Sequence, residues 1–389
     1  FVPVVTLALT GDAARSMFDG RYVVDNYSLI MKAFFLLTGY VVVLLSQTEL
    51  EEGGYYQGEY YLLMLASVLG MVMMASSRDL VAVFVAFELL SIPTYLLAAW
   101  RKRDEHSNEA GVKYFLMGVF ATGVLLFGMS YLYGTSGSTK LVDIATALGS
   151  GDLIGLQVVG VVFVIAGFAF KVSAVPFHTW APDTYQGAPL PVTAYLSVAS
   201  KAGGFVALLN VLFLGLWPAD DVIEPFLWVL AVLTMTVGNV LALRQTNFVR
   251  MLAYSSVSQG GFILMPLAVM ATGDAGGSAL KAVVIYLLIY AFSNLGAFGV
   301  IMAVARKTGR GDIESFGGLI TYAPGLAVMQ TIFLASLAGW PPMGIWIAKF
   351  QAFKTVLDAG DSAAVALAIV AAVNTVVSAA YYMKVLRVI

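Results

Sequence analysis

The sequence predicts an all-α protein that crosses a membrane many times. Its 389 residues are 60% hydrophobic and only 11% charged, and the mean hydropathy is +0.87, whereas soluble domains carry about 25% charged residues. Apolar runs of about twenty residues, the length that a spanning helix needs, follow one another along the chain. Basic residues gather in alternate loops, as the positive-inside rule requires. The alternative, a large soluble helical protein, does not fit this composition.

The apolar runs give the expected helices. We predict spans at 27–47, 59–76, 79–100, 110–133, 153–180, 190–216, 225–243, 248–271, 279–305, 323–356 and 362–386. The apolar fragment 1–10 is too short to span, and with it the count is about twelve helices. Because no soluble domain interrupts them, we expect 1–389 to form a single transmembrane domain. The chain begins without Met and ends directly after an apolar run, so we expect at least one further helix at each end.

The loop charges predict which side is cytoplasmic. The basic loops hold Arg101, Lys102 and Arg103, then Arg244 and Arg250, then Arg306, Lys307 and Arg310, then Lys384 and Arg387. The intervening loops are poor in such residues, since 134–152 has only Lys140 and 217–224 has none. The basic side is therefore predicted to be cytoplasmic. The N-terminal part fits less well, because Arg15 and Arg21 fall on the predicted outside and the acidic TELEEGG stretch falls inside.

Two of the predicted spans are interrupted by proline. Pro176 lies five residues after Lys171, and Pro341-Pro342 precedes Lys349. Proline removes a backbone donor and clashes with the preceding turn, and in lipid the freed carbonyls need a partner from protein or water. Broken helices in corresponding places of two halves are typical of a transport pathway at mid-membrane. The breaks lie about 170 residues, or five helices, apart, which predicts two inverted five-helix repeats at 59–216 and 225–386.

Four ionisable residues lie deep inside apolar runs: Glu88, Lys171, Lys201 and Lys349. An ionisable group at the bilayer centre costs about 2.5–3.5 kcal/mol on insertion scales, so such a residue is by default a functional candidate. We expect Glu88 to pair with Lys171 as a two-state element, and the three amines to hold and release protons. The alternatives are a structural ion pair at Glu88, lysines that satisfy freed carbonyls or snorkel, and a packing role for Lys201.

His178, in PFHTWAP after the first break, is a candidate proton link, with a structural hydrogen bond as the alternative. Lys32 and Lys281 lie near run ends and are expected to snorkel. Further polar residues inside the runs are candidates to hold water: Tyr254, Ser255, Ser256, Ser258, Gln259, Ser293, Asn294, Asn374 and Ser378. The absence of cysteine excludes thiolate-held iron–sulfur clusters and disulfides, and two histidines make a bis-histidine haem a poor fit. We therefore expect no electron-carrying cofactor in this chain.

Several motifs resemble one known family. The segment KVSAVPFHTWAPDTYQGAPLPVTAYLSVASK, from Lys171 to Lys201, is similar to the signature of the antiporter-like membrane subunits of proton-pumping NADH:quinone oxidoreductase, respiratory complex I. The Gly187-Ala188-Pro189 turn and Lys201 resemble the subunits called N in bacteria, the counterparts of mitochondrial subunit 2. The stretches FELLSIPTYLL, ALRQTNFVRMLAYSSVSQGGF, FSNLGAFG and SLAGWPP agree with this, so that the resemblance covers nearly the whole chain.

The resemblance implies a fourteen-helix fold with inverted five-helix repeats and two broken helices. It implies that Glu88, Lys171, Lys201 and Lys349 are the proton-channel residues. NADH, FMN, iron–sulfur clusters and quinone are then expected in partner subunits, and the other subunits of complex I and the lipid bilayer are the expected partners, with no nucleic acid. This chain departs from many relatives in carrying Gln259 where they have His, and in the segment Met343-Gly344-Ile345.

The sequence therefore predicts a non-redox, proton-translocating subunit of NADH:quinone oxidoreductase in the bacterial inner membrane. Two alternatives stay open at this point. One is a subunit of a multi-component Na⁺/H⁺ antiporter, which shares the ancestry. The other is a structural membrane subunit that only anchors its neighbours and tolerates loss of the four charges.

Overall fold

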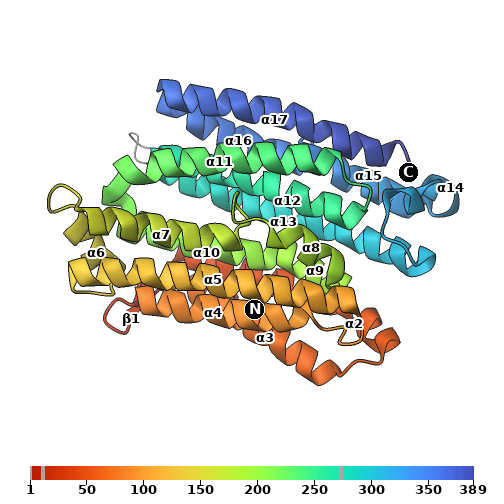
Figure 1. Cartoon of the computed structure of the whole chain (residues 1–389), viewed down its shortest axis with the longest axis horizontal. Helices are drawn as coiled ribbons and strands as arrows, with labels where there is room; N and C mark the ends of the chain where they lie inside the picture. The colour runs from red at the N-terminus through yellow and green to blue at the C-terminus, as the bar shows by residue number, and fades with distance from the viewer. Residues whose placement is uncertain (1, 10–13, 271–274) are drawn as a thin grey trace. The chain divides into compact units, whose positions relative to one another are not determined.

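The computed structural model describes residues 2–9, 14–270 and 275–389, and the described chain is almost wholly helical (Figure 1). It divides into two compact units. The first comprises Phe1–Val172 and Ala199–Ile223, and the second comprises Ser173–Val198 and Glu224–Ile389. The units are therefore interleaved in sequence, and each is described separately below.

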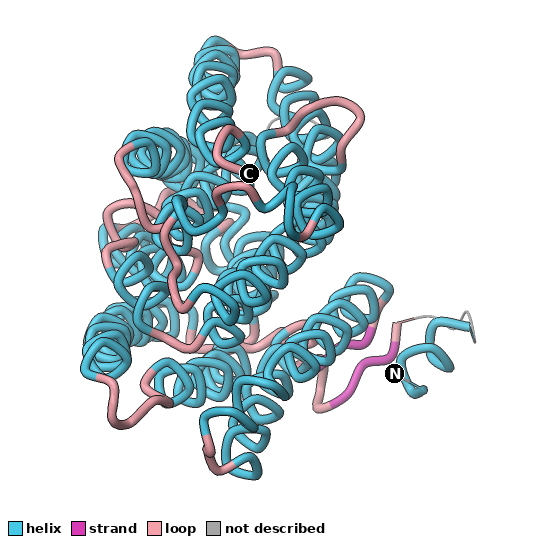
Figure 2. The backbone as a smooth tube through the Cα atoms, turned by 90° about the vertical axis from the view of Figure 1, so that its right-hand side faces the viewer, coloured by secondary structure: helices cyan, strands magenta, loops and turns pink. Residues whose placement is uncertain are grey.

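The first unit is built on four long helices packed in succession. Helix α3 packs on α4, α4 on α5, and α5 on α7, and α10 packs on α3, α4 and α7 (Figure 1). The antiparallel hairpin β1–β2, with Arg15 opposite Val24, is the magenta segment near the N-terminus in Figure 2. The elements are α1 (Val2–Leu9), β1 (Arg15–Met17), β2 (Tyr22–Val24), α2 (Asn26–Gly53), α3 (Gln57–Met74), α4 (Leu80–Ala98), α5 (Glu105–Ser136), α6 (Leu141–Leu148), α7 (Gly155–Lys171), α10 (Lys201–Val211), a π-helical turn (Leu212–Leu216) and a 3₁₀ turn (Trp217–Ala219).

The second unit is centred on α13, which packs against α15, α16 and α9. Helix α12 packs on α8, and α17 packs on α15 and α16. The elements are α8 (Trp180–Gly187), α9 (Leu190–Tyr195), α12 (Phe248–Leu264) with a 3₁₀ turn (Met265–Val269), α13 (Ala275–Thr308), a 3₁₀ turn (Ile313–Phe316), α14 (Leu319–Tyr322), α15 (Pro324–Ala338), α16 (Gly344–Ala359) and α17 (Ser362–Leu386). Two further elements straddle the unit boundaries, namely the π-helical turn Leu196–Ser200 and α11 (Asp220–Leu243).

Capping residues and close backbone approaches explain the local structure. The side chain of Asp79 accepts from the amides of Val81 and Ala82 and starts α4, and this satisfies amides that otherwise lack a partner. A Cβ on Gly70 would lie 2.5 Å from the amide nitrogen of Leu90, so only glycine lets α3 approach α4 this closely.

The helices confirm the predicted fold class of an all-α, multi-pass membrane protein. Among the described residues, eight helices are long and apolar enough to cross a membrane, and α7 and α15 are shorter apolar helices. Both predicted breaks are present: α7 ends at Lys171 before the cis bond Val175–Pro176, and α15 ends at Ala338 before the cis bond Pro341–Pro342. The division into inverted repeats at 59–216 and 225–386 stays a prediction.

Two local expectations were wrong, and a third span is less regular than an ordinary α-helix. Helix α2 continues through most of the acidic TELEEGG stretch to Gly53, because its end is set by Gly54 in the left-handed conformation (φ +62°) and not by the first charge. The predicted loop 134–152 contains the amphipathic helix α6. The predicted span 190–216 lies within the candidate membrane span Leu190–Leu243 and is confirmed, but it includes two π-helical turns at Leu196–Ser200 and Leu212–Leu216.

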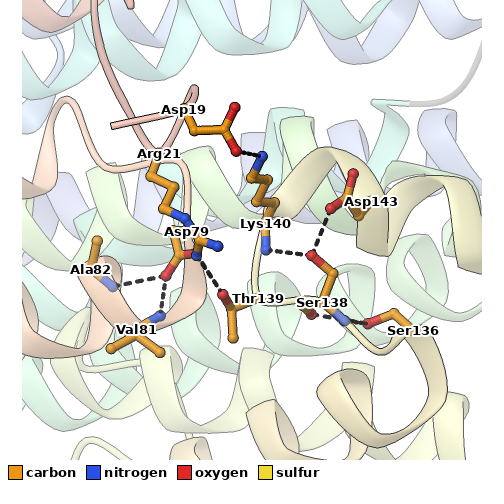
Figure 3. A network of polar contacts seen from close by, with 10 residues as sticks. All are labelled: Asp19, Arg21, Asp79, Val81, Ala82, Ser136, Ser138, Thr139, Lys140 and Asp143. Atoms are coloured by element: carbon orange, nitrogen blue, oxygen red, sulfur yellow. Dashed lines mark hydrogen bonds and ion pairs between the residues drawn. The ribbon is translucent and has the colours of Figure 1, made fainter. Parts of the chain in front are cut away.

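A polar network holds the hairpin against the first unit (Figure 3). The guanidinium of Arg21 pairs with the carboxylate of Asp79 and donates to the hydroxyl of Thr139. Thr139 also donates to Asp79 at 2.6 Å, and the ammonium of Lys140 pairs with Asp19. The hairpin, the start of α4 and the loop before α6 are thereby joined, so the helix that carries Glu88 has a fixed N-terminus.

Candidate functional site

Lys171 is the last residue of α7 and lies in a cage of hydroxyls and aromatic rings. Its side chain is 1% exposed. Nζ donates to the hydroxyl of Ser91 at 3.0 Å and to that of Tyr114 at 2.9 Å. The rings of Phe87, Tyr95 and Tyr114 have their centroids 5.8, 5.7 and 5.4 Å from Nζ. Two charge-assisted hydrogen bonds and three ring faces stabilise an ammonium in this apolar setting.

Glu88 does not pair directly with Lys171, which corrects the expected ion pair. Among the described residues, the hydrogen-bond partner of its carboxylate is Thr122, whose hydroxyl donates to Oε1 at 2.9 Å, and the side chain is half-buried. The reason is the helix geometry: Glu88 and Ser91 lie three residues apart on α4 and are surface neighbours, and Ser91 takes the position beside the amine.

Lys201 begins α10 immediately after the π-helical turn Leu196–Ser200 and is 2% exposed. Its helix lies directly against Lys171. A Cβ on Gly204 would come within 2.9 Å of Cγ of Lys171, and one on Gly203 within 2.8 Å of Leu90. The small residues at these positions therefore bring the helix of one buried amine against the side chain of the other.

Lys349 lies in the second unit, in the first turns of α16 after the break, and is 4% exposed. Its Nζ lies 4.2 Å from the centroid of the Phe262 ring and donates to the hydroxyl of Thr375 at 3.5 Å. Gly339, with φ +84°, packs against the lysine stem, because a Cβ there would lie 3.1 Å from Cδ. Glycine is required twice at this position, for the backbone angle and for the space.

His178 lies in the irregular segment between α7 and α8 and is 9% exposed. Its Nδ1 has no hydrogen-bond partner among the described residues. Lys32 is only 6% exposed and its ammonium lies over the ring of Tyr22 at 5.0 Å, and snorkelling stays a prediction for this residue. The role of His178 as a proton link stays a prediction.

The structure brings Glu88, Lys171 and Lys201 together in the first unit and places Lys349 and His178 in the second. Sequence reasoning missed Tyr114, whose hydroxyl accepts a hydrogen bond from Lys171. The signal was a tyrosine in an apolar span, because a buried phenol needs a hydrogen-bond partner. Within the described ranges, no group of three or more His, Cys, Asp or Glu side chains is arranged to hold a metal ion.

The chain is similar to known proteins, and these agree with the geometry described above. A family model described as "NADH:quinone oxidoreductase/Mrp antiporter, TM" matches residues 77–375. The chain belongs to this family. NADH-quinone oxidoreductase subunit N 2 of Solibacter usitatus is 41% identical over 388 residues, which is 98% of this chain and 76% of that protein. Subunit N of Trichlorobacter lovleyi is 40% identical over 97% of this chain and 77% of its own length.

Solved structures show the same relationship. A chain of respiratory complex I from Thermus thermophilus with bound aureothin matches with a TM-score of 0.81 and 31% identity, over 100% of this chain and 81% of that one. A chain of the Mrp complex from Dietzia sp. matches with a TM-score of 0.82 and 24% identity, over 95% and 67%, and shows the shared fold alone. Within the family this chain therefore groups with the antiporter-like N subunits, multi-pass proteins of the bacterial inner membrane.

Proposed function

We propose that this chain translocates protons as a subunit of NADH:quinone oxidoreductase, assembled with the other subunits of that complex. The observation that carries the proposal is the placement of Lys171, Lys201 and Lys349, three amines at most 4% exposed in apolar helices. Lys171 lies at the end of one broken helix and Lys349 at the start of the other broken segment. Charged groups in such positions are costly and are kept where ions or protons pass.

In the first unit, the Glu88 carboxylate is proposed to control the charge of the Lys171 amine. Neighbours three residues apart on a helix are about 5–6 Å apart at Cβ, and one unit charge acting over about 6–8 Å at an effective dielectric constant of about 20 contributes about 2–3 kcal/mol. Protonating or displacing Glu88 therefore changes the stability of the Lys171 ammonium by an amount that matters. The proton of Lys171 then has an acceptor in Lys201, on the helix that packs against it.

Lys349 is the proposed third amine of the path, and water is proposed to join the steps. The hydroxyl of Thr375 offers its Nζ an acceptor, while the ring of Phe262 holds the charged form. No residue of this chain is assigned a redox role. NADH, FMN, iron–sulfur clusters and quinone are proposed to bind in partner subunits, because a chain without cysteine offers no thiolate for such clusters.

The test replaces Lys171 or Lys201 with Met in the assembled complex. Inner-membrane vesicles are energised with NADH, and the number of protons moved per NADH oxidised is measured beside the amount of assembled complex. We expect assembly at the normal level and a large loss of pumping. Full pumping in both variants would refute the proposal and leave a structural, anchoring role.

The shared fold with an Mrp complex chain keeps a second candidate, transport of Na⁺ against H⁺. The same vesicles distinguish the two. Proton movement that depends on NADH and quinone and is unchanged by removing Na⁺ supports the oxidoreductase function, whereas a requirement for Na⁺ supports the antiporter.

A further inference from the structure

Gln259 is a buried amide of α12 whose two ends are both hydrogen-bonded. Its side chain is 1% exposed. Nε2 donates to the backbone carbonyl of Leu337 at 2.9 Å and lies 3.4 Å from the hydroxyl of Tyr382, while Oε1 accepts from the hydroxyl of Tyr286. A phenol donates to one end and a carbonyl accepts at the other, so the orientation of the amide is fixed.

The carbonyl of Leu337 needs this donor because of the break in the helix. In a continuous α-helix it would accept from the amide four residues later, but that residue is Pro341, which has no N–H. The neighbouring carbonyls are satisfied locally, since the amide of Gly339 donates to Ser336 at 2.8 Å and that of Trp340 to Ala335 at 3.1 Å. Gln259 therefore supplies the one donor that Pro341 removes from Leu337.

This hydrogen bond lies next to Lys349. Gly339, two residues after Leu337, packs on the lysine stem, and Phe262, three residues after Gln259, lies 4.2 Å below the ammonium. Helix α12 thus holds the end of α15 through Gln259 and faces the amine through Phe262. A shift of the Leu337 carbonyl would move Gly339 and open the space around Lys349.

Helix α17 is hydrogen-bonded to the same group of helices. The hydroxyl of Tyr382 bonds to that of Ser255 on α12. Also on α17, Asn374 accepts from Nδ2 of Asn239 at 3.0 Å, and the neighbouring Thr375 accepts from Lys349. Helices α12 and α17, which face the Lys349 ammonium, are therefore held by hydrogen bonds between uncharged groups. Gln259 lies at the point where α12, α13 and α15 meet.

We propose that Gln259 is a positioning residue for proton transfer at Lys349, and that it acts by replacing the backbone donor lost at Pro341. The inference rests on the proposed function, in which Lys349 carries protons. It requires one donor and one acceptor at position 259. A protonated carboxylic acid offers both, an ionised carboxylate offers only acceptors, and an apolar side chain offers neither.

The experiment measures protons moved per NADH in vesicles that contain the whole complex, between pH 6 and pH 9. Gln259→Leu is expected to lower the ratio about fivefold to tenfold at every pH. Gln259→Glu is expected to match the wild type at low pH and to fall toward the Leu variant as pH rises. The matched control is Ile263→Val, a buried position on the same helix where the loss of one methylene removes no hydrogen-bonding group, and we expect no change.

The outcomes separate the inference from the proposed function. If Lys349→Met loses pumping while Gln259→Leu pumps like Ile263→Val, the positioning role is wrong and the proposed function stands. If Lys349→Met pumps normally, the place of Lys349 in the proposed path fails and the positioning role fails with it, whereas loss of pumping in Lys171→Met and Lys201→Met still supports proton translocation. Should Gln259→Leu not assemble, the Glu variant decides: a pH-independent ratio overturns the positioning role, because a side chain that only fills space has no reason to respond to pH.

Discussion

Replacing Tyr114 with Phe tests whether the ammonium form of Lys171 depends on its hydroxyl partners. The substitution removes one of the two hydrogen bonds that Nζ donates, at 2.9 Å, and keeps the ring 5.4 Å away. A hydrogen bond to a charged group contributes about 1.5–3 kcal/mol. The cation–π contact, about 0.5–2 kcal/mol, is retained. A loss of this hydrogen-bond energy corresponds to about ten- to one-hundredfold in an equilibrium constant, and we expect pumping to fall by about tenfold or more.

Tyr95→Phe is the matched control. Its ring lies 5.7 Å from Nζ, almost as close as that of Tyr114, but among the described residues Nζ donates to Ser91 and Tyr114 and not to Tyr95. The assay is NADH-driven acidification of inner-membrane vesicles, scaled to the amount of complex by a reaction at the NADH site alone. The reasoning is wrong if Tyr114→Phe stays within twofold of the wild type, or if both variants lose pumping equally.

Two further predictions concern stability. Gly238→Val should lower the stability of the purified complex by about 1–3 kcal/mol, because a Cβ at this position would lie 2.6 Å from the amide nitrogen of Ser258. The loss should appear as a lower melting temperature in detergent. Gly123→Ala is the control and should not lower it, because a Cβ there would have no atom within 4 Å. Asp19→Asn should lower the melting temperature of the complex at pH 7 but not in acid. Its ion pair with Lys140 lowers the pKa of the Asp19 carboxyl below the usual 3.8. The stabilisation is thus present above pH 3.8 and lost as pH falls through the lowered value, so melts of variant and wild type should converge.

The sequence was sufficient for features that depend on local pattern. Apolar runs located the spans, prolines located the breaks, and the cost of burying charge pointed to Lys171, Lys201 and Lys349, all of which are buried. The same reasoning failed for Glu88, because depth within an apolar run does not say which face of the helix a residue occupies. The Glu88 carboxylate is half-buried beside Thr122, while Ser91, one turn further along the same helix, contacts the amine of Lys171.

Hydrogen-bond partners could not be predicted, because they are distant in sequence. Tyr114 is 57 residues from Lys171, and Leu337 is 78 residues from Gln259. Gln259 was expected only to hold water, since its sequence neighbours do not indicate that Pro341 leaves the carbonyl of Leu337 without a donor. The π-helical turn before Lys201 was also invisible, because its residues Leu196–Ser200 have an ordinary apolar helical pattern.

The interleaving of the two units constrains how such a protein can be made and recombined. The chain passes between them after Val172, after Val198 and after Ile223. During synthesis the first unit receives α10, with Lys201, only after 173–198 of the second unit has left the ribosome. In a nascent chain that ends at Val172, the side chain of Lys171 is not yet covered by Gly204 of α10. A chimera that exchanges one unit between two relatives needs three junctions, so a single genetic crossover cannot transfer either half intact.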